Sequence, residues 1–357
     1  MPARPDQQLD ASNLPDLARG CRLLGAGGGG DTELGLEMAL QAVEEHGPVE
    51  LVALGDLPAD ARVMPCGLAG SPAVSEERIW SGDEGGELRA VVERLGGGGV
   101  AALMCCGIAG ASGLLPVTWA ARTRLPLADA DGMGRAFPRL EQQAMRIASV
   151  PASPVVLSDG RGGTVVIEEA DDARAGRLAR GVAASFGGVC AVALYCMTAG
   201  QAREAAIGGS VSRAVAVGRA AADDGRRIGA LCDALEAVVL IEGKVVDVQR
   251  GTGEDAVGGS LTVQADPGRR MRLVRLELQN EYLLALEDGA VLASAPDVIC
   301  VLSADTAEPV PTDRIRIGEQ VVVTAWAGPA IWRTDRGLPV AGPAAFGYDT
   351  VYVALRP

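Results

Sequence analysis

The sequence predicts an α/β N-terminal domain followed by an α+β C-terminal domain with a β-rich end. Two patterns carry this prediction. Helical and β-type segments alternate up to about residue 168, whereas short β-type segments separated by turns dominate after residue 238. A chain of 357 residues also exceeds what one compact core usually covers. We therefore predict two domains, residues 1–168 and 169–357.

In the first domain, two similar segments predict neighbouring parallel strands. Residues 63–70 read VMPCGLAG and residues 103–110 read LMCCGIAG, and each β-type run breaks into a glycine loop. A helical stretch at 87–95 lies between them, which gives the order strand, loop, helix, strand. Such connections place loops at one edge of a parallel sheet. We expect a further strand over 125–131 and a helix over 138–148.

The composition disfavours two classes of partner. The chain has 32 basic and 46 acidic residues, a net charge of −14, so we expect neither nucleic acid nor a membrane surface as partner. Residues 1–13 are polar, and no segment approaches 18 uninterrupted apolar residues. The eight cysteines lie mostly in apolar runs, a pattern typical of reduced thiols. We expect a cytoplasmic protein.

The single histidine restricts the available chemistry. His46 follows two glutamates at a predicted helix end, where it complements the helix dipole. A Ser-His-Asp or Cys-His relay would depend on this one residue, and a histidine-rich metal site cannot be built. Proton transfer is therefore expected from carboxylates, thiols, Lys or Tyr.

A glycine loop precedes the second predicted helix. The segment 25–30 formally fits G-x-G-x-x-G, but it follows a helix, whereas the dinucleotide fingerprint follows a strand. Consecutive glycines expose backbone N–H groups beside a helix N-terminus, which favours an anionic or carbonyl oxygen. Asp31 either caps that helix or joins such a site. A tight turn is the alternative, but four glycines exceed what a turn needs. The four are Gly27, Gly28, Gly29 and Gly30.

Two aspartates end the strand predicted over 125–131. Because side chains alternate along a strand, Asp129 and Asp131 share a face, where they could share a proton or hold a hard cation. Gly132 then opens a Gly-Met-Gly loop, which favours a shaped site. A surface turn with two capping aspartates is an equally supported interpretation.

Adjacent cysteines offer a different chemistry at the same sheet edge. Cys105 and Cys106, with Cys66, could supply a nucleophile or soft metal ligands, although buried apolar cysteines are the preferred interpretation. A divalent metal ion is thus a candidate cofactor. Its candidate ligands are Asp129, Asp131, Cys66, Cys105 and Cys106.

Polar interruptions in the second domain give three further candidates. Lys244, in a Glu-Gly-Lys break of an apolar run, could act on a carbonyl if desolvated, although a solvated hairpin turn fits as well. Asn280 and Glu281 separate two apolar stretches and would need partners if buried, so they could face a ligand or a sheet junction.

Six motifs, in chain order, resemble one family. They are LGAGGGGD (24–31), DADGMGRAFP (129–138), EGKVVD (242–247), QNEY (279–282), PDVIC (296–300) and AFGYD (345–349). Together they make the chain similar to the S-methyl thiohydantoin desulfurase-like family, whose genes often lie beside, or are fused to, hydantoinase/oxoprolinase-type enzymes. One position departs from the family: relatives tend to carry a Glu where this chain has Gly107, just after Cys106.

The resemblance implies an enzyme that acts on a small cyclic amide or thiohydantoin-like ring and cleaves a C–S or C–N bond. Asp129 and Asp131 would supply acid/base or metal-binding carboxylates, and the glycine loop would hold a ring carbonyl or oxyanion. The residues expected to position the substrate are Asp31, Gly132, Lys244, Asn280 and Glu281.

Two alternatives remain open at this point. The first is a non-catalytic, small-molecule-binding partner of a hydantoinase/oxoprolinase-type protein, which the missing Glu favours. The second is a thiol- or metal-dependent enzyme that uses Cys66, Cys105 and Cys106, with Cys106 as the catalytic thiol. A small-molecule substrate and a homo-oligomer are expected in the leading interpretation.

Overall fold

The computed structural model describes residues 8–71, 74, 78–222, 227–250, 258–265 and 272–355. Its contacts divide the chain into two units that are both discontinuous in sequence. Unit 1 comprises Met1–Leu24, Gly29–Gly134 and Arg139–Gly218; unit 2 comprises Gly25–Gly28, Arg135–Pro138 and Arg219–Pro357. The predicted sequence boundary lies after residue 168, whereas the contacts keep the following helices up to Gly218 with unit 1.

Unit 1 is built on a mixed sheet with the order β1-β2-β5-β4-β3-β8-β6-β7, in which β9 joins β3 and β10 joins β5. Strands β2, β5, β4 and β3 are parallel neighbours. The parallel pairing predicted for the two similar segments is confirmed, with Cys66 opposite Cys105. The strands are β1 (Gln8–Leu9), β2 (Val49–Val52), β3 (Arg62–Gly70), β4 (Val100–Cys105), β5 (Leu127–Asp131), β6 (Val155–Ser158), β7 (Thr164–Ile167), β8 (Val189–Ala193), β9 (Met197–Thr198) and β10 (Ile207–Gly208).

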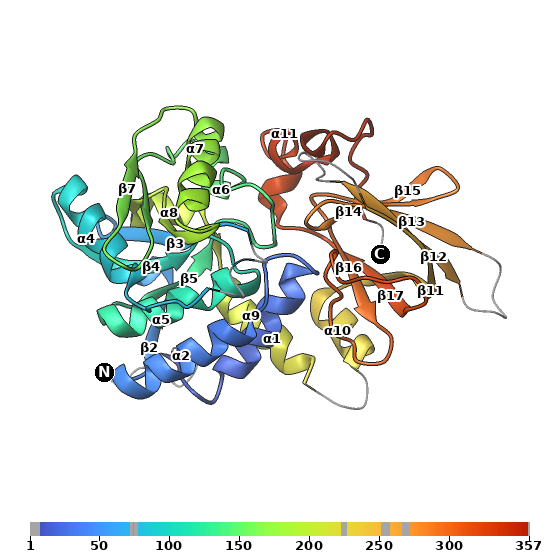
Figure 1. Ribbon diagram of the computed structural model, residues 1–357, viewed down its shortest axis with the longest axis horizontal. Helices are drawn as coiled ribbons and strands as arrows, with labels where there is room; N and C mark the ends of the chain where they lie inside the picture. The colour runs from blue at the N-terminus through green and yellow to red at the C-terminus, as the bar shows by residue number, and fades with distance from the viewer. Residues whose placement is uncertain are drawn as a thin grey trace. The chain divides into compact units, whose positions relative to one another are not determined.

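Helices cover both faces of this sheet (Figure 1). Helices α2 and α4 both pack against α5, whereas α7 and α8 pack on β3 from the other side. Small buried residues such as Ala175 and Ala179 let α7 approach the sheet closely. The helices are α1 (Leu14–Gly25), α2 (Glu33–His46), α4 (Glu84–Gly96), α5 (Leu115–Thr123), α6 (Ala144–Ile147), α7 (Asp172–Ser185), α8 (Ala199–Ala205) and α9 (Ser210–Ala220).

The helix predicted over 138–148 is wrong, because only the single turn α6 forms there. Gln143 is extended, with φ −118° and ψ 142°, and the N–H of Ala144 donates to Gly132 O at 2.7 Å instead of to a preceding helical turn. The three polar residues before α6 are buried: Glu141, Gln142 and Gln143.

Unit 2 contains a curled antiparallel sheet with the order β15-β14-β13-β12-β11-β17-β16. Burial alternates along β11, where Ile241, Gly243 and Val245 are buried and the residues between them are exposed, as expected for a sheet with one covered face. The strands are β11 (Val238–Arg250), β12 (Gly259–Ala265), β13 (Leu273–Leu278), β14 (Tyr282–Glu287), β15 (Ala290–Ser294), β16 (Val298–Ser303) and β17 (Gln320–Trp326); helices α10 (Arg227–Leu235) and α11 (Leu338–Ala341) accompany them.

These two architectures confirm the predicted fold class, an α/β first part and a β-rich second part. Among the described residues, no helix is long and apolar enough to cross a membrane. Residues 1–7 of the predicted polar N-terminal segment lie outside the described residues.

Candidate functional site

In unit 1, three glycine-containing loops meet at the carboxyl edge of the parallel strands. Strand β4 ends at Cys105 and β5 ends at Asp131. The N–H of Ile108, in the loop after β4, donates to Asp131 Oδ2 at 2.9 Å. The N–H of Ala111, in the same loop, donates to Gly29 O at 3.2 Å. The edge of an open α/β sheet where strands end is the usual place for a ligand.

Two of these loops touch through their backbones, and this contact requires glycine. Gly29 has φ +83° and Gly110 has φ +61°, conformations that side chains disfavour. A Cβ on Gly110 would overlap Gly29 O, and a Cβ on Gly29 would come within 3.0 Å of Ala109 O. The second half of the glycine loop is therefore held against the loop after β4.

Asp131 is the most unusual group at this edge, because its carboxylate is fully buried. Oδ2 accepts the N–H groups of Gly134, Ile108 and Met133 at 2.7, 2.9 and 3.1 Å. Oδ1 has no hydrogen-bond partner among the described residues. Burial raises the pKa of Asp131 to about 6, against the opposing effect of the backbone donors. A carboxyl group with such a pKa exchanges protons near neutral pH.

Asp129 has a different role, although it lies on the same strand. Its Oδ1 accepts the N–H groups of Val211 and Ser212 at 2.9 and 3.0 Å, and its Oδ2 accepts the Ser212 hydroxyl at 2.6 Å. It thus satisfies the N-terminus of α9. Among the described contacts no hydrogen bond joins Asp129 to Asp131, so each carboxylate has its own set of donors.

The three candidate thiols are buried around β3 and β4. Burial raises the pKa of Cys66, Cys105 and Cys106 well above the ordinary thiol value, and neighbouring thiols raise it further. Because the thiolate is the reactive form, this environment disfavours both nucleophilic attack and metal binding.

The surroundings of Asp131 do not fit a cation. Three backbone N–H groups point at Oδ2, and their positive ends would repel a metal ion placed there. Within the described ranges, no group of three or more His, Cys, Asp or Glu side chains is arranged to hold a metal. We therefore route no chemical step through a metal.

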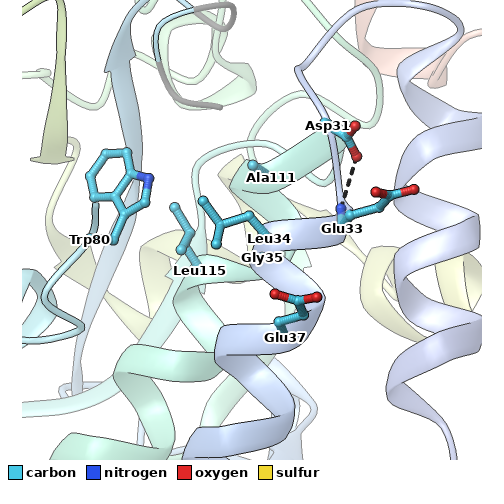
Figure 2. A pocket seen from close by; sticks show the side chains of 8 residues that line it. All are labelled: Asp31, Glu33, Leu34, Gly35, Glu37, Trp80, Ala111 and Leu115. Atoms are coloured by element: carbon cyan, nitrogen blue, oxygen red, sulfur yellow. Dashed lines mark hydrogen bonds between the residues drawn. The ribbon is translucent and has the colours of Figure 1, made fainter. Parts of the chain in front are cut away.

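A pocket of about 250 Å³ lies beside the start of α2 (Figure 2). Asp31 and Glu33 stand on one side of it, and the Trp80 ring faces Leu34 and Leu115 on the other. Asp31 Oδ1 accepts the N–H of Glu33 at 2.9 Å, so Asp31 fixes the start of α2 and also lines the pocket. The complete lining is Asp31, Glu33, Leu34, Gly35, Glu37, Trp80, Ala111 and Leu115.

Within unit 2, Glu281 is a second buried carboxylate. Its Oε2 has no hydrogen-bond partner among the described residues. Burial raises the pKa of Glu281 to about 7, although the Arg135 charge opposes the shift. A Cβ on Gly28 would lie 2.8 Å from Glu281 Cγ, and a Cβ on Gly27 would lie 2.8 Å from Val310 O. The first half of the glycine loop therefore packs on this part of unit 2.

Arg135 is a buried charged residue that sequence reasoning missed. It is fully buried, and its Nη1 donates to Pro296 O at 2.8 Å and to Asp297 O at 2.9 Å. Its guanidinium lies 4.8 Å from the centroid of the Phe137 ring. Burial lowers its pKa to about 10, although Glu281 and Asp297 oppose this. The one basic residue in the motif 129–138, which otherwise carries only the two aspartates as charged groups, was the available signal.

The remaining predicted residues differ in their positions. Lys244 is exposed on β11, and Asn280 is exposed in the turn before β14, where its carbonyl accepts the Thr312 hydroxyl at 3.0 Å. Gly132 is buried, and a Cβ there would overlap Gln143 Oε1. A Cβ on Gly107 would lie 3.0 Å from Met133 Sδ, so Met133 occupies the space beside this position.

The fold and the buried carboxylates of Asp131 and Glu281 define a two-part protein, with an α/β part that ends in glycine loops and a β-rich part that holds Arg135 and Glu281. The chain belongs to the S-Me-THD-like family: the N-terminal domain of that family matches residues 12–169 and the C-terminal domain matches residues 170–355.

A solved structure shares this fold. It is the crystal structure of a protein from Chromobacterium violaceum. The superposition includes 97% of this chain and 99% of the other, with a TM-score of 0.77 and 23% sequence identity. At this identity the match shows the fold alone. Among curated proteins no relative matches the chain.

Proposed function

We propose that this chain is an enzyme that acts on a small cyclic amide or thiohydantoin-like ring and cleaves a C–S or C–N bond. Membership of the S-Me-THD-like family supports an enzyme-like role related to thiohydantoins. The observation that carries the proposal is Asp131, a buried carboxyl group with a pKa of about 6 at the edge where the loops of unit 1 meet.

The pocket beside α2 suits a flat ring with N–H groups. Trp80 offers an aromatic face, and Leu34 and Leu115 add apolar contact for the ring. Asp31 and Glu33 supply acceptors for ring N–H groups. A ligand of five ring atoms is small enough for a volume of about 250 Å³.

Asp131 would handle the proton of a hydrolytic step. It lies beneath the segment of Met133 and Gly134, which are only partly buried. In its ionised form it would accept a proton from the attacking water. With an S-methyl ring, water adds to the C=N carbon that bears sulfur and the C–S bond breaks. One proton of the water leaves with the thiolate as methanethiol, the other stays on the ring nitrogen, and the carbon becomes a carbonyl. With C–N cleavage, the ring nitrogen leaves with that proton.

The test is turnover by the purified full chain. Hydantoin, 2-thiohydantoin and an S-methyl thiohydantoin are each incubated with protein, and mass spectrometry follows ring opening and release of methanethiol. We expect product with at least one ring, a rise of kcat/KM through about pH 6 as Asp131 ionises, and loss of turnover in Asp131→Asn. Asp288→Asn, the same change in an exposed turn, is the matched control and should keep full activity.

A second candidate function is a non-catalytic, small-molecule-binding partner of a hydantoinase/oxoprolinase-type protein. One observation favours it: Asp131 is not among the residues that line the pocket. In that case rings would quench Trp80 fluorescence and Trp80→Ala would weaken binding, but no ring would be converted. Full turnover by Asp131→Asn would remove Asp131 from the mechanism.

A further inference from the structure

The two carboxylate oxygens of Asp131 differ in their hydrogen bonding. Oδ2 accepts three backbone N–H groups, from Gly134, Ile108 and Met133, whereas Oδ1 accepts none from the described residues. A proton cannot sit on Oδ2 without facing three N–H groups that already point at it. When Asp131 is protonated, the proton must therefore lie on Oδ1.

Ser210 lies just after the short strand that pairs with the end of β5. Strand β10 pairs antiparallel with β5, with Ile207 opposite Asp131. The N–H of Gly209 donates to Asp129 O at 2.7 Å, which fixes the turn into α9. Ser210, the first residue of α9, is 4% exposed. Its Oγ and Asp131 Oδ1 are both buried, and neither has a hydrogen bond of ordinary geometry among the described residues.

The Ser210 hydroxyl and burial have opposite effects on the pKa of Asp131. The Ser210 hydroxyl lowers the pKa of Asp131, as a donor to the ionised carboxylate does, and so partly opposes the effect of burial. The charge of Asp131 acts on the buried thiols of Cys21, Cys105 and Cys106, whose pKa values are raised mainly by burial and further by this charge. None of these thiols ionises near pH 6.

We infer that Ser210 is a positioning residue for Asp131, whose hydroxyl donates to Oδ1 of the ionised carboxylate and accepts the Oδ1 proton of the acid. A hydroxyl serves both states, because it carries one hydrogen and two lone pairs and rotates freely. No covalent bond forms or breaks at Ser210, and the proton that leaves Asp131 passes to substrate or water. The inference depends on the proposed function in one respect only, namely that the proton released by Asp131 takes part in catalysis.

The test measures the ionisation of Asp131 directly. Protein labelled with ¹³C at the aspartate carboxyl carbons is titrated by NMR, and Asp131→Asn identifies the resonance by its disappearance. In Ser210→Ala we expect the acid dissociation constant of Asp131 to fall by about tenfold, because the ionised form loses a charged hydrogen bond. Ser210→Thr keeps the hydroxyl and should titrate closer to the wild type.

Ser212→Ala is the matched control, since Ser212 lies on the same helical turn but donates to Asp129. It should leave the titration of Asp131 unchanged. If Ser210→Ala does not fold, Ser210→Cys replaces the hydroxyl by a weaker donor and should shift the titration in the same direction. An Asp131 titration in the alanine or cysteine variant that matches the wild type overturns the inference.

The outcome is separable from that of the proposed function. A shifted titration with no turnover of any ring supports the role of Ser210 and contradicts the enzyme proposal. Turnover of a ring with an unshifted titration of Asp131 supports the enzyme proposal and contradicts the role of Ser210. If both hold, the acidic limb of kcat/KM in Ser210→Ala should move to higher pH by the same factor as the NMR titration.

Discussion

The two units each bury a carboxylate, but they compensate its charge in different ways. Asp131 in unit 1 is held by three neutral backbone donors, whereas Glu281 in unit 2 has the full charge of Arg135 nearby. Both pKa values nevertheless rise, to about 6 and about 7. In both places burial outweighs the compensating groups, so the pKa of each carboxyl group lies above its ordinary value.

The comparison shows that Arg135 and Glu281 do not form a simple stabilising ion pair. The pKa of Arg135 is lowered and that of Glu281 is raised, so both shifts favour the neutral form. Burial therefore outweighs the attraction between the two charges. Arg135 also makes other interactions, because its guanidinium donates hydrogen bonds to two backbone carbonyls and lies over the Phe137 ring. The arrangement in unit 1 instead depends on the shape of the loops.

The largest expected effect comes from Arg135→Met. It leaves the carbonyls of Pro296 and Asp297 without their donor and Glu281 without a counter-charge. We expect a loss of roughly 3–5 kcal/mol in the free energy of unfolding, measured with urea. The double variant Arg135→Met with Glu281→Gln should recover part of this loss. If the double variant is no more stable than the single one, Glu281 does not interact with the Arg135 charge.

Glu281→Gln should change how stability depends on pH. Because the folded pKa of about 7 lies above the ordinary value of 4.5, the folded state binds the proton more tightly, so stability is greatest below pH 4.5 and falls as pH rises through 7. The wild type should lose roughly 3 kcal/mol from this group over that window. In the variant, the free energy of unfolding should not fall with pH in this way, even if its value differs from that of the wild type by a constant amount. An unchanged slope contradicts the assignment.

Asp131→Asn should remove a similar but slightly smaller slope at lower pH. The folded pKa of about 6 lies above 3.8, so the stabilisation is present below pH 3.8 and is lost as pH rises through 6. We again expect roughly 3 kcal/mol, read from urea unfolding between pH 4 and 8. Asp288→Asn serves as the control, because this exposed residue should leave the slope intact.

Lys244→Met should have the smallest effect. Lys244 is exposed on β11, so we expect a change within about 0.5 kcal/mol in the free energy of unfolding. A loss well above this value would show that Lys244 makes a contact that its exposure does not suggest.

Sequence reasoning placed the sheet edge correctly but could not assign its two aspartates. The alternation of a strand puts Asp129 and Asp131 on one face, and both do end β5. The partners of Asp129 were not readable, because α9, which Asp129 caps, begins about eighty residues later in the chain. Arg135 was missed for the same reason, since its acceptors at Pro296 and Asp297 are 161 and 162 residues away.

The exposed position of Lys244, in contrast, could have been read from the sequence. Ile241, Gly243 and Val245 alternate inward along β11, which leaves Lys244 on the outer face by the period of two. The two interpretations given for Lys244, a lysine that acts on a carbonyl if desolvated and a solvated hairpin turn, did not use that alternation. The helix predicted over 138–148 failed for a local reason: the polar residues before α6 are buried, and the chain passes through a turn at Arg139–Gln142 and an extended Gln143 that helical periodicity does not describe.

The interleaving of the chain has a consequence for cutting the protein in two. A fragment that begins at residue 170, where the C-terminal family domain begins, carries Glu281 but lacks both Gly28 and Arg135. Its partner fragment keeps Asp129 but not α9, whose first N–H groups that carboxylate accepts. Each half would thus inherit an acidic group separated from its natural complement, and separately produced halves should regain full stability only when mixed.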